Sequence, residues 1–387
     1  MKKNFLLFMI IISVFFTLGC KGTKQEIDKL AIVMAVGFDL TEENKYMVTV
    51  QILNVEKQSS GNGMKAGAQQ NLSDTIVYSA EGDTPSAAVA KLSTQLGKKI
   101  FFFHSKYTVI GETLAEAGLA LQVDAILRGQ ETRLDLPLFV TKGRAFDIIA
   151  ATTPEEKIPA NSVASLIGQQ ELMGYSPIVS RVDFGSALEN KTLAPILGII
   201  NINKNKYSTA TFEMSGTAVF KKDKLIGFLD TNQTRGMQWI KGKVKAGNIV
   251  VPSWKDRAIS FEITTASSKI KPILKDNKIM IEINIKEKGN IRELTGDIDP
   301  MKEPKIMEEL SKVQGKAIEN EVKLALKASQ KDLKADIFDF GGIIHSDCPE
   351  IWKRMEKDWE VIYPDINVEV KIKADLERPG VISKPMK

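Results

Sequence analysis

The sequence has few of the residues that build metal and disulfide sites, with two cysteines and two histidines among 387 residues. Two cysteines can form at most one bridge, whereas exported domains held by disulfides carry several. His104 is remote in sequence from His345, and the single His-x-x-Cys step from His345 to Cys348 lacks the paired spacing of a zinc site. We therefore expect neither a disulfide framework nor a bound metal.

Short catalytic motifs are also missing from the sequence. It contains no Gly-x-Ser-x-Gly elbow, no phosphate-binding Gly-Lys-Ser/Thr loop and no His-Glu-x-x-His helix. Gly61, Gly63 and Gly67 resemble a dinucleotide loop, but they are one residue out of register and no helical pattern follows. Asp336 and Asp339 bracket an aromatic turn, yet no spacing marks them as an acid/base pair. We expect a protein that is not an enzyme and binds no cofactor.

No charge of one sign dominates the chain. The 53 basic and 48 acidic residues give a formal charge of +5 and are interleaved along the sequence. This balance is too weak to indicate a nucleic-acid partner. The hydrophobic share of 43% is ordinary for a globular protein, and the length suggests two or three domains.

The N-terminus is typical of a secretory leader. Lys2 and Lys3 precede an apolar run, residues 5–18, which is shorter than the ~20 residues that span a bilayer as a helix. An uncleaved membrane anchor is therefore the less favoured interpretation. The small residue before Cys20 resembles the lipobox of bacterial lipoproteins, in which cleavage precedes the cysteine and its sulfur carries a diacylglyceryl group. We predict a signal peptide over 1–19 and a lipidated tether over 20–29. The two acyl chains of a diacylglyceryl group on Cys20 would anchor the protein stably.

Strand and helix patterns begin after the tether. Residues 29–40 and 46–55 are rich in Val and Ile, and the polar turn between them predicts a hairpin. Thr84 followed by Pro85 is typical of a helix start. Alternating strands and helices continue to about residue 150, followed by helical pieces interrupted by prolines, so the sequence predicts an N-terminal α/β domain over 30–190.

Two more domains are predicted, a middle β-rich domain over 191–265 and a C-terminal α/β domain over 266–387. Ile279, Ile281, Ile283 and Ile285 alternate with polar residues, which predicts a strand with one buried face. Apolar residues at three-to-four spacing predict a long helix over 304–331. The fold class is a mixed α/β (α+β) protein whose mixed and antiparallel sheets are flanked by helices, with a long helix near the C-terminus followed by a closing strand.

The C-terminal segment brings a further helix and that strand. Pro349 fits the first turn of a helix, and Ile351, Trp352, Met355 and Trp359 form an apolar stripe with the spacing of core residues. Alternating apolar residues from Ile366 to Ile372 then indicate the closing strand.

The segment "KADIFDFGGIIHSDCPEIWKRMEKDWEVIYPDINVEVKIKADLERPGVI" resembles the C-terminal signature of the Ger(x)C lipoproteins, the C subunits of bacterial spore germinant receptors. Residues 26–40 resemble the family's first strand, and residues 128–145 resemble a further family segment. Lys21 departs from the tryptophan common in relatives, and "HSDC" at 345–348 replaces a more basic and aromatic stretch. The residues that carry the C-terminal resemblance are Asp336, Phe338, Phe340, Gly341, Pro349, Trp352, Trp359, Pro364, Pro379 and Gly380.

The resemblance implies a function. It implies a three-domain protein without catalytic activity, held by the diacylglyceryl group of Cys20 on the outer face of the spore's inner membrane. It also implies a membrane A subunit and a transporter-like B subunit as partners, in a receptor that senses small nutrients and starts germination. Asp336, Phe340, Gly341, Pro349, Trp352 and Trp359 are then expected to be structural signature residues.

Two other functions compete with this one. A solute-binding lipoprotein that delivers a small ligand to a membrane transporter needs two similar lobes around a pocket, and the sequence shows no duplication. A surface hydrolase acting on the wall needs an acid/base pair in a cleft. The sequence nominates no such pair.

Overall fold

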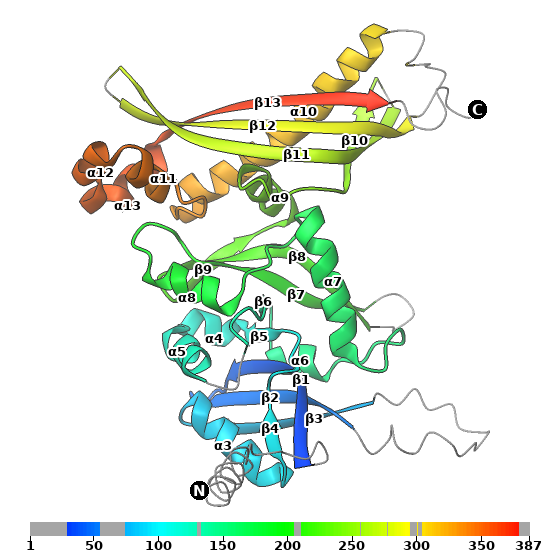
Figure 1. The fold of residues 1–387 in the computed structure, drawn as a ribbon, viewed down its shortest axis with the longest axis vertical. Helices are drawn as coiled ribbons and strands as arrows, with labels where there is room; N and C mark the ends of the chain where they lie inside the picture. Colours follow the sequence, from blue (N-terminus) through cyan, green and yellow to red (C-terminus); the bar gives the residue numbers. More distant parts are fainter. Residues whose placement is uncertain are drawn as a thin grey trace, which may run out of the picture.

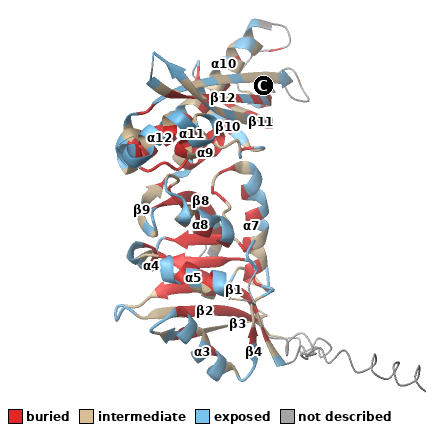
Figure 2. Ribbon diagram, turned by 60° about the vertical axis from the view of Figure 1, so that its left-hand side comes forward, coloured by how far each residue is buried: buried red, intermediate tan, exposed pale blue. Residues whose placement is uncertain are grey.

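The computed structural model describes residues 29–54, 74–129, 133–204, 210–255, 257–276, 278–294, 300 and 304–378. The predicted leader, Cys20, the glycine-containing loop at 61–67, Pro379 and Gly380 lie outside these residues. The molecule is elongated, with one sheet in its lower and middle parts and a second sheet at the top (Figure 1). Buried residues line the strands of both sheets (Figure 2).

The first sheet has nine strands, in the order β3-β2-β1-β5-β6-β7-β8-β9, with β4 paired to β1. Its centre, from β1 through β5 and β6 to β7, is parallel, and both outer parts are antiparallel. The predicted hairpin is confirmed, because Leu40 of β1 pairs with Tyr46 of β2. The strands are β1 Leu30–Leu40, β2 Tyr46–Leu53, β3 Thr75–Gly82, β4 Lys99–Phe101, β5 Thr108–Gly111, β6 Leu138–Thr141, β7 Ile196–Lys204, β8 Ala210–Lys221 and β9 Lys224–Leu229.

Helices cover both faces of this sheet, which explains why its central strands are apolar almost without alternation. One face packs on α3 (Pro85–Leu96), α4 (Glu112–Ala117), α5 (Ala120–Arg128) and α8 (Arg181–Glu189). The other packs on α6 (Ala145–Ala150) and α7 (Pro159–Met173). The helix start predicted at Thr84 is confirmed, since the Thr84 hydroxyl accepts a hydrogen bond from the Ala87 N–H at 3.1 Å.

The second sheet has the order β10-β11-β12-β13. In β12, Ile281, Ile283 and Ile285 are buried and Ile279 is half-buried, as the alternation predicted. The closing strand β13 is also confirmed, and it pairs with β12 in parallel. The strands are β10 Asn248–Trp254, β11 Arg257–Lys275, β12 Lys278–Leu294 and β13 Asn367–Arg378.

The helices of this part differ in detail from the sequence prediction. The long helix is present as α10 (Pro304–Lys327), and a π-helical turn, Ala328–Leu333, continues it. The helix predicted from Pro349 through Trp359 is divided: α12 (Pro349–Met355) is followed by a 3₁₀ turn and by α13 (Trp359–Ile362).

One predicted domain boundary falls between two elements of the fold, and the other falls inside a strand. The boundary at 190/191 lies between α8 and β7, and β7 belongs to the same sheet as β6. The boundary at 265/266 falls inside β11. The division into three domains therefore stays a prediction.

The two sheets meet through α9 (Thr231–Ile240), which packs against α10. Gly236 of α9 permits this contact, because a Cβ atom there would lie 1.9 Å from the Glu321 carbonyl oxygen and 2.9 Å from the Ala325 Cβ. Trp239 extends from the same helix and donates a hydrogen bond from Nε1 to the Glu321 carboxylate at 2.7 Å. One apolar core, with members from both sheets and both helices, surrounds the contact.

Replacing Gly236 by Ala should force α9 and α10 apart. We expect Gly236→Ala to lower the free energy of unfolding by about 2 kcal/mol or more, as overpacking of a tight contact does. Urea denaturation followed by tryptophan fluorescence would measure the change.

Gly168→Ala is the matched control. Gly168 is exposed in α7, and a Cβ there meets no atom within 4 Å. Alanine at this helical position should be neutral or stabilise by up to about 1 kcal/mol. Equal stability of the Gly236→Ala variant and this control would contradict a tight helix contact.

Candidate functional site: the C-terminal cap and the cleft beside it

The six predicted signature residues lie in one compact unit, residues 334–366, which we call the C-terminal cap. It contains α11 (Phe340–Asp347), α12 and α13. The backbone N–H of Ala194, just before β7, donates a hydrogen bond to the Asp336 carbonyl at 2.8 Å. Lys241, at the end of α9, donates from Nζ to the Ile337 carbonyl at 3.0 Å. The cap is thus bonded both to the first sheet and to α9.

Asp336 fixes the turn that begins the cap. Its side chain is 4% exposed and accepts hydrogen bonds from the backbone N–H groups of Phe338 at 3.2 Å, Phe340 at 3.1 Å and Gly341 at 2.9 Å. Burial raises the pKa of the Asp336 carboxyl to about 6, and these three N–H groups oppose the rise. The Asp336 carboxylate therefore has a structural role: it holds the turn closed by accepting three backbone hydrogen bonds.

Close packing explains the other signature positions. A Cβ on Gly341 would lie 2.8 Å from the Thr192 Cβ and 2.9 Å from the Trp359 Nε1, so no larger residue fits there. Trp352 meets Trp359 edge-on, with ring centroids 5.3 Å apart, and both are buried. Pro349 occupies the first turn of α12 and is exposed. These residues build the cap, while their value as a family signature stays a prediction.

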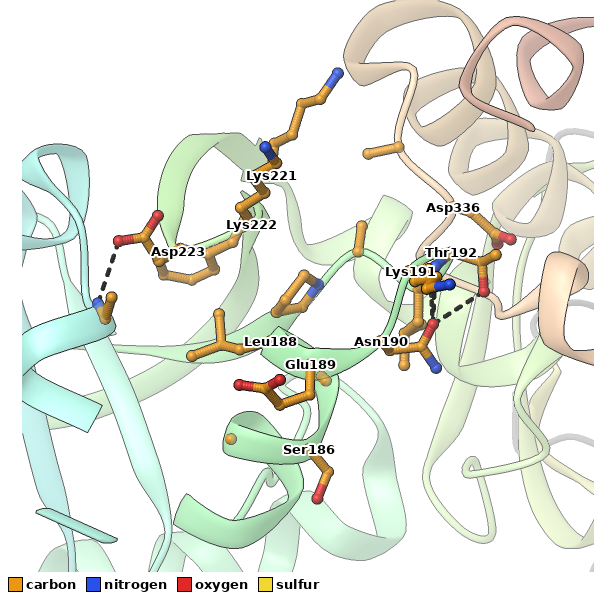
Figure 3. Close-up of a pocket in the computed structure, with 18 of the residues that line it drawn as sticks. Ser186, Leu188, Glu189, Asn190, Lys191, Thr192, Lys221, Lys222, Asp223 and Asp336 are labelled. Atoms are coloured by element: carbon orange, nitrogen blue, oxygen red, sulfur yellow. Dashed lines mark hydrogen bonds between the residues drawn. The ribbon is translucent and has the colours of Figure 1, made fainter. Parts of the chain in front are cut away.

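An open cleft of about 1000 Å³ separates the cap from the helical side of the first sheet (Figure 3). Partly exposed apolar side chains, among them Leu127, Val182 and Leu188, form part of its lining. Four lysines also line it, at positions 191, 221, 222 and 334. Five carboxylates, at positions 124, 189, 223, 336 and 360, line it as well, so the cleft combines an apolar surface with charged groups of both signs.

The walls of the cleft are held by specific polar contacts. The Asn190 Oδ1 accepts hydrogen bonds from the Thr192 N–H at 2.8 Å and from the Leu193 N–H at 3.0 Å, which fixes the segment leading into β7 (Figure 3). The Asp223 carboxylate accepts from the Ala120 N–H at 3.2 Å, at the start of α5.

Two exposed ion pairs join the first sheet and its flanking segment to the cap. Lys221 pairs with Glu360 at 2.8 Å, and Lys191 pairs with Glu356 at 3.4 Å. Such surface pairs each contribute about 0–1 kcal/mol, so they orient the cap more than they hold it.

No catalytic constellation forms among the described residues. His104 lies in a turn three residues after β4, whereas His345 packs on Trp352 in the cap, with ring centroids 5.9 Å apart. Within the described part of the chain, no three His, Cys, Asp or Glu side chains are placed to hold a metal ion. Five carboxylates line the cleft. Asp336 and Asp223 accept hydrogen bonds from backbone N–H groups, Glu360 pairs with Lys221, and Asp124 pairs with Arg128. The fifth, Glu189, is exposed.

A buried polar cluster lies behind the cap, where α9, α10 and β12 meet. Arg235 of α9 approaches Glu321 of α10, with Nη1 and Oε1 3.6 Å apart. Glu287 of β12 is 1% exposed and accepts a hydrogen bond from the Gln314 Nε2 at 2.9 Å. Burial raises the pKa of Glu287 to about 8, with a further rise from Asp375, while Arg235 opposes it. Glu287 is therefore held largely protonated at neutral pH.

The cleft and the polar cluster were not found from the sequence. Their residues come from segments separated by up to 240 positions, and no local spacing relates them. A weak signal existed for Glu287 alone, because it follows Ile279, Ile281, Ile283 and Ile285 on the buried face of the same strand.

None of the helices in the described ranges has the length and apolar character needed to cross a membrane. The fold and site thus define a two-sheet α/β protein with a helical cap and a partly apolar cleft that carries charges of both signs.

Two family models match the chain in succession. "Spore germination protein N-terminal domain" matches residues 23–202, and "Spore germination B3/GerAC like, C-terminal" matches residues 215–380. The chain belongs to the Ger(x)C family of spore germination proteins.

Curated relatives from the same family match this chain over almost their whole length. Spore germination protein KC of Bacillus subtilis strain 168 is 27% identical, over 100% of this chain and 98% of the relative. Spore germination protein B3 of the same organism is 23% identical over 95% of each chain. The crystal structure of the GerBC protein matches 88% of this chain and 96% of its own with a TM-score of 0.55 at 20% identity, and so shares the fold. The predicted family and fold class are confirmed.

Glu287 should make stability depend on pH. Its pKa is about 8 in the folded state and near 4.5 when unfolded, so between these values the folded state binds more protons. The free energy of unfolding should therefore fall as the pH rises from 6 to 9. A Glu287→Gln variant should not show this decrease. At pH 9 its free energy of unfolding, measured by urea denaturation, should exceed that of the wild type by a few kcal/mol.

Glu282→Gln, in the same strand, is the control. Lys371 lowers the pKa of Glu282 by direct hydrogen bonding, so this carboxylate is charged throughout the range from pH 6 to 9. Its variant should differ from the wild type by a constant amount across that range. A Glu287→Gln variant that behaves in the same constant way would contradict the buried, protonated Glu287.

Proposed function

We propose that this chain is the non-catalytic lipoprotein C subunit of a nutrient-germinant receptor, needed for the receptor assembly or signalling that starts spore germination. The observation that carries the proposal is the succession of the two family domains over residues 23–202 and 215–380, in a chain that relatives match from end to end. A cap and cleft built without a reaction centre in the described residues suit a docking role.

The proposed location is the outer face of the spore's inner membrane. A leader that ends at Cys20 would give a diacylglyceryl cysteine, and Leu30 begins β1 ten residues later. This arrangement would hold the folded part close to the bilayer. Two lipid chains on one cysteine are sufficient for stable anchoring.

The proposed partners are the membrane A subunit and the transporter-like B subunit. The cleft suits a protein segment, because it is open and presents lysines beside apolar side chains. Subunit contacts here would let the chain hold the receptor together or gate it.

The two competing functions gain no support. A solute-binding lipoprotein would bring two similar lobes together, whereas the described sheets have nine strands and four strands in unrelated orders. A wall hydrolase needs free carboxylates in a cleft. Asp223 and Asp336 instead accept hydrogen bonds from backbone N–H groups, and Glu360 and Asp124 form ion pairs. Glu189 is then one remaining exposed carboxylate, whereas an acid/base pair needs two.

Deleting the gene tests the proposed function. Spores of the deletion strain, in a background without parallel receptors of the same class, should lose optical-density decrease and dipicolinate release in response to some amino acids, sugars or nucleosides. Sporulation and germination by nutrient-independent triggers should stay normal, and the restored gene should return the response. A normal response to every nutrient in that background would contradict the proposal.

Cys20→Ala tests the tether separately. Without the acyl chains the protein should leave the spore membrane fraction, and nutrient germination should weaken. Immunoblots of membrane and soluble fractions give the location, and Cys348→Ala is the control, since a free thiol in the cap has no part in anchoring. Unchanged membrane association and germination in the Cys20→Ala strain would overturn the tether.

A further inference from the structure

A cluster of lysine and phenylalanine side chains lies at one end of the first sheet. We call residues 98–106 of this cluster, "KKIFFFHSK", the basic aromatic patch. Phe103 is 43% exposed, and its ring lies 5.4 Å from that of Phe101, which in turn lies 5.7 Å from His104. Lys98, Lys99 and Lys106 are exposed around these rings. A single exposed apolar side chain is ordinary, so the informative feature here is that three consecutive phenylalanines, of which Phe101 and Phe102 are half-buried, lie among exposed lysines.

The patch is positioned directly beside the start of the folded chain. Its strand β4 pairs in parallel with the first residues of β1, with Leu30 opposite Lys99 and Ile32 opposite Phe101. Cys20 precedes Leu30 by ten residues, which reach at most about 35 Å when fully extended. Any surface that holds Cys20 is therefore within reach of the patch.

The charge of the patch is of one sign. No Asp or Glu occurs between Gly97 and Gly111. Asp74, directly before β3, lies at the end of the strands where β1 begins. Four other acidic residues near the adjoining strands lie at the opposite end, where Leu40 pairs with Tyr46 and Tyr46 with Gly82. These acidic residues are Glu42, Glu43, Glu81 and Asp83.

We propose that the basic aromatic patch lies on the anionic surface of the membrane that carries the Cys20 tether, an inference that rests on the tether of the proposed function. Each lysine near an anionic leaflet contributes about 1 kcal/mol of attraction, and aromatic rings favour the interface below it. A flexible tether alone leaves the protein free to rotate. The patch adds a second contact and so sets its orientation.

This orientation has a consequence for the receptor. β4 lies near one end of the long axis, and the four-stranded sheet lies at the other end (Figure 1). With the patch on the membrane, the second sheet and the cap lie away from the bilayer. The cleft then lies between the membrane-bound first sheet and the cap. Partners would then reach the cleft from the side.

A tryptophan probe at the patch tests the contact. The four native tryptophans are all at or beyond position 239, so the first sheet up to β9 has none of its own. The lipidated chain carrying Phe103→Trp is reconstituted on vesicles of phosphatidylcholine and phosphatidylglycerol with brominated acyl chains, which quench nearby indoles. We expect the extra emission of this variant, relative to the wild type, to fall at least two-fold, and to recover on phosphatidylcholine alone.

Two further variants make the test specific. Leu121→Trp places the same probe on α5, where Leu121 is 46% exposed, and its emission should not change with brominated lipid. Adding Lys98→Glu and Lys106→Glu to the Phe103→Trp chain should abolish the quenching while the acyl tether persists.

The outcomes separate the patch from the tether. Co-sedimentation with vesicles of phosphatidylcholine alone, which carry no net charge, reports the tether. A chain that co-sediments but shows equal, unquenched emission at positions 103 and 121 on the anionic vesicles overturns the membrane contact and leaves the tether standing. A chain that does not co-sediment overturns both.

Discussion

The contact between α9 and α10 at Gly236 is the constraint on which the rest of the structure depends. It brings the nine-stranded and four-stranded sheets into one apolar core, to which Val219 and Leu229 contribute from one side and Ile283 and Ile318 from the other. The buried pairing of Arg235 and Trp239 with Glu321 fixes the rotation of the helices about that contact. Because the cap is bonded to both β7's leading segment and the end of α9, its position follows from the same contact.

A rigid arrangement of this kind suits a protein that acts through its surfaces. The buried carboxyls hold turns and helices in place: Asp336 gathers three backbone N–H groups, and Glu287 bonds to Gln314. The features left for partners are the cleft beside the cap and the basic aromatic patch at the other end. They lie far apart along the molecule, so a membrane contact and a subunit contact can be made at once.

Local patterns in the sequence predicted the local structure well. The hairpin of β1 and β2, the alternation of Ile281, Ile283 and Ile285, and the capped start of α3 each depend on residues a few positions apart. The parallel pairing of β13 with β12 could not be predicted in this way, because its two strands are about 80 residues apart and no turn joins them. The sheet that continues across the predicted boundary at 190/191 was missed for the same reason.

The signature residues show what a resemblance adds and what it lacks. It named Asp336, Gly341 and Trp359 as signature residues, which stays a prediction, and it gave no physical reason for their identity. That reason is a turn which folds back on its own carboxylate and a ring placed 2.9 Å from where a Cβ of Gly341 would be. The cleft could not be predicted from the sequence. Its lysines come from three separate segments, which only the packing of the cap brings together.

The most direct test of the account is to isolate the chain from detergent-solubilised spore inner membranes through an affinity tag and identify what comes with it. Membership of a germinant receptor predicts that two membrane proteins, an A subunit and a transporter-like B subunit, are recovered together with it, and that neither is recovered from a strain lacking the tag. Recovery of the chain alone from membranes that contain both proteins would contradict the account.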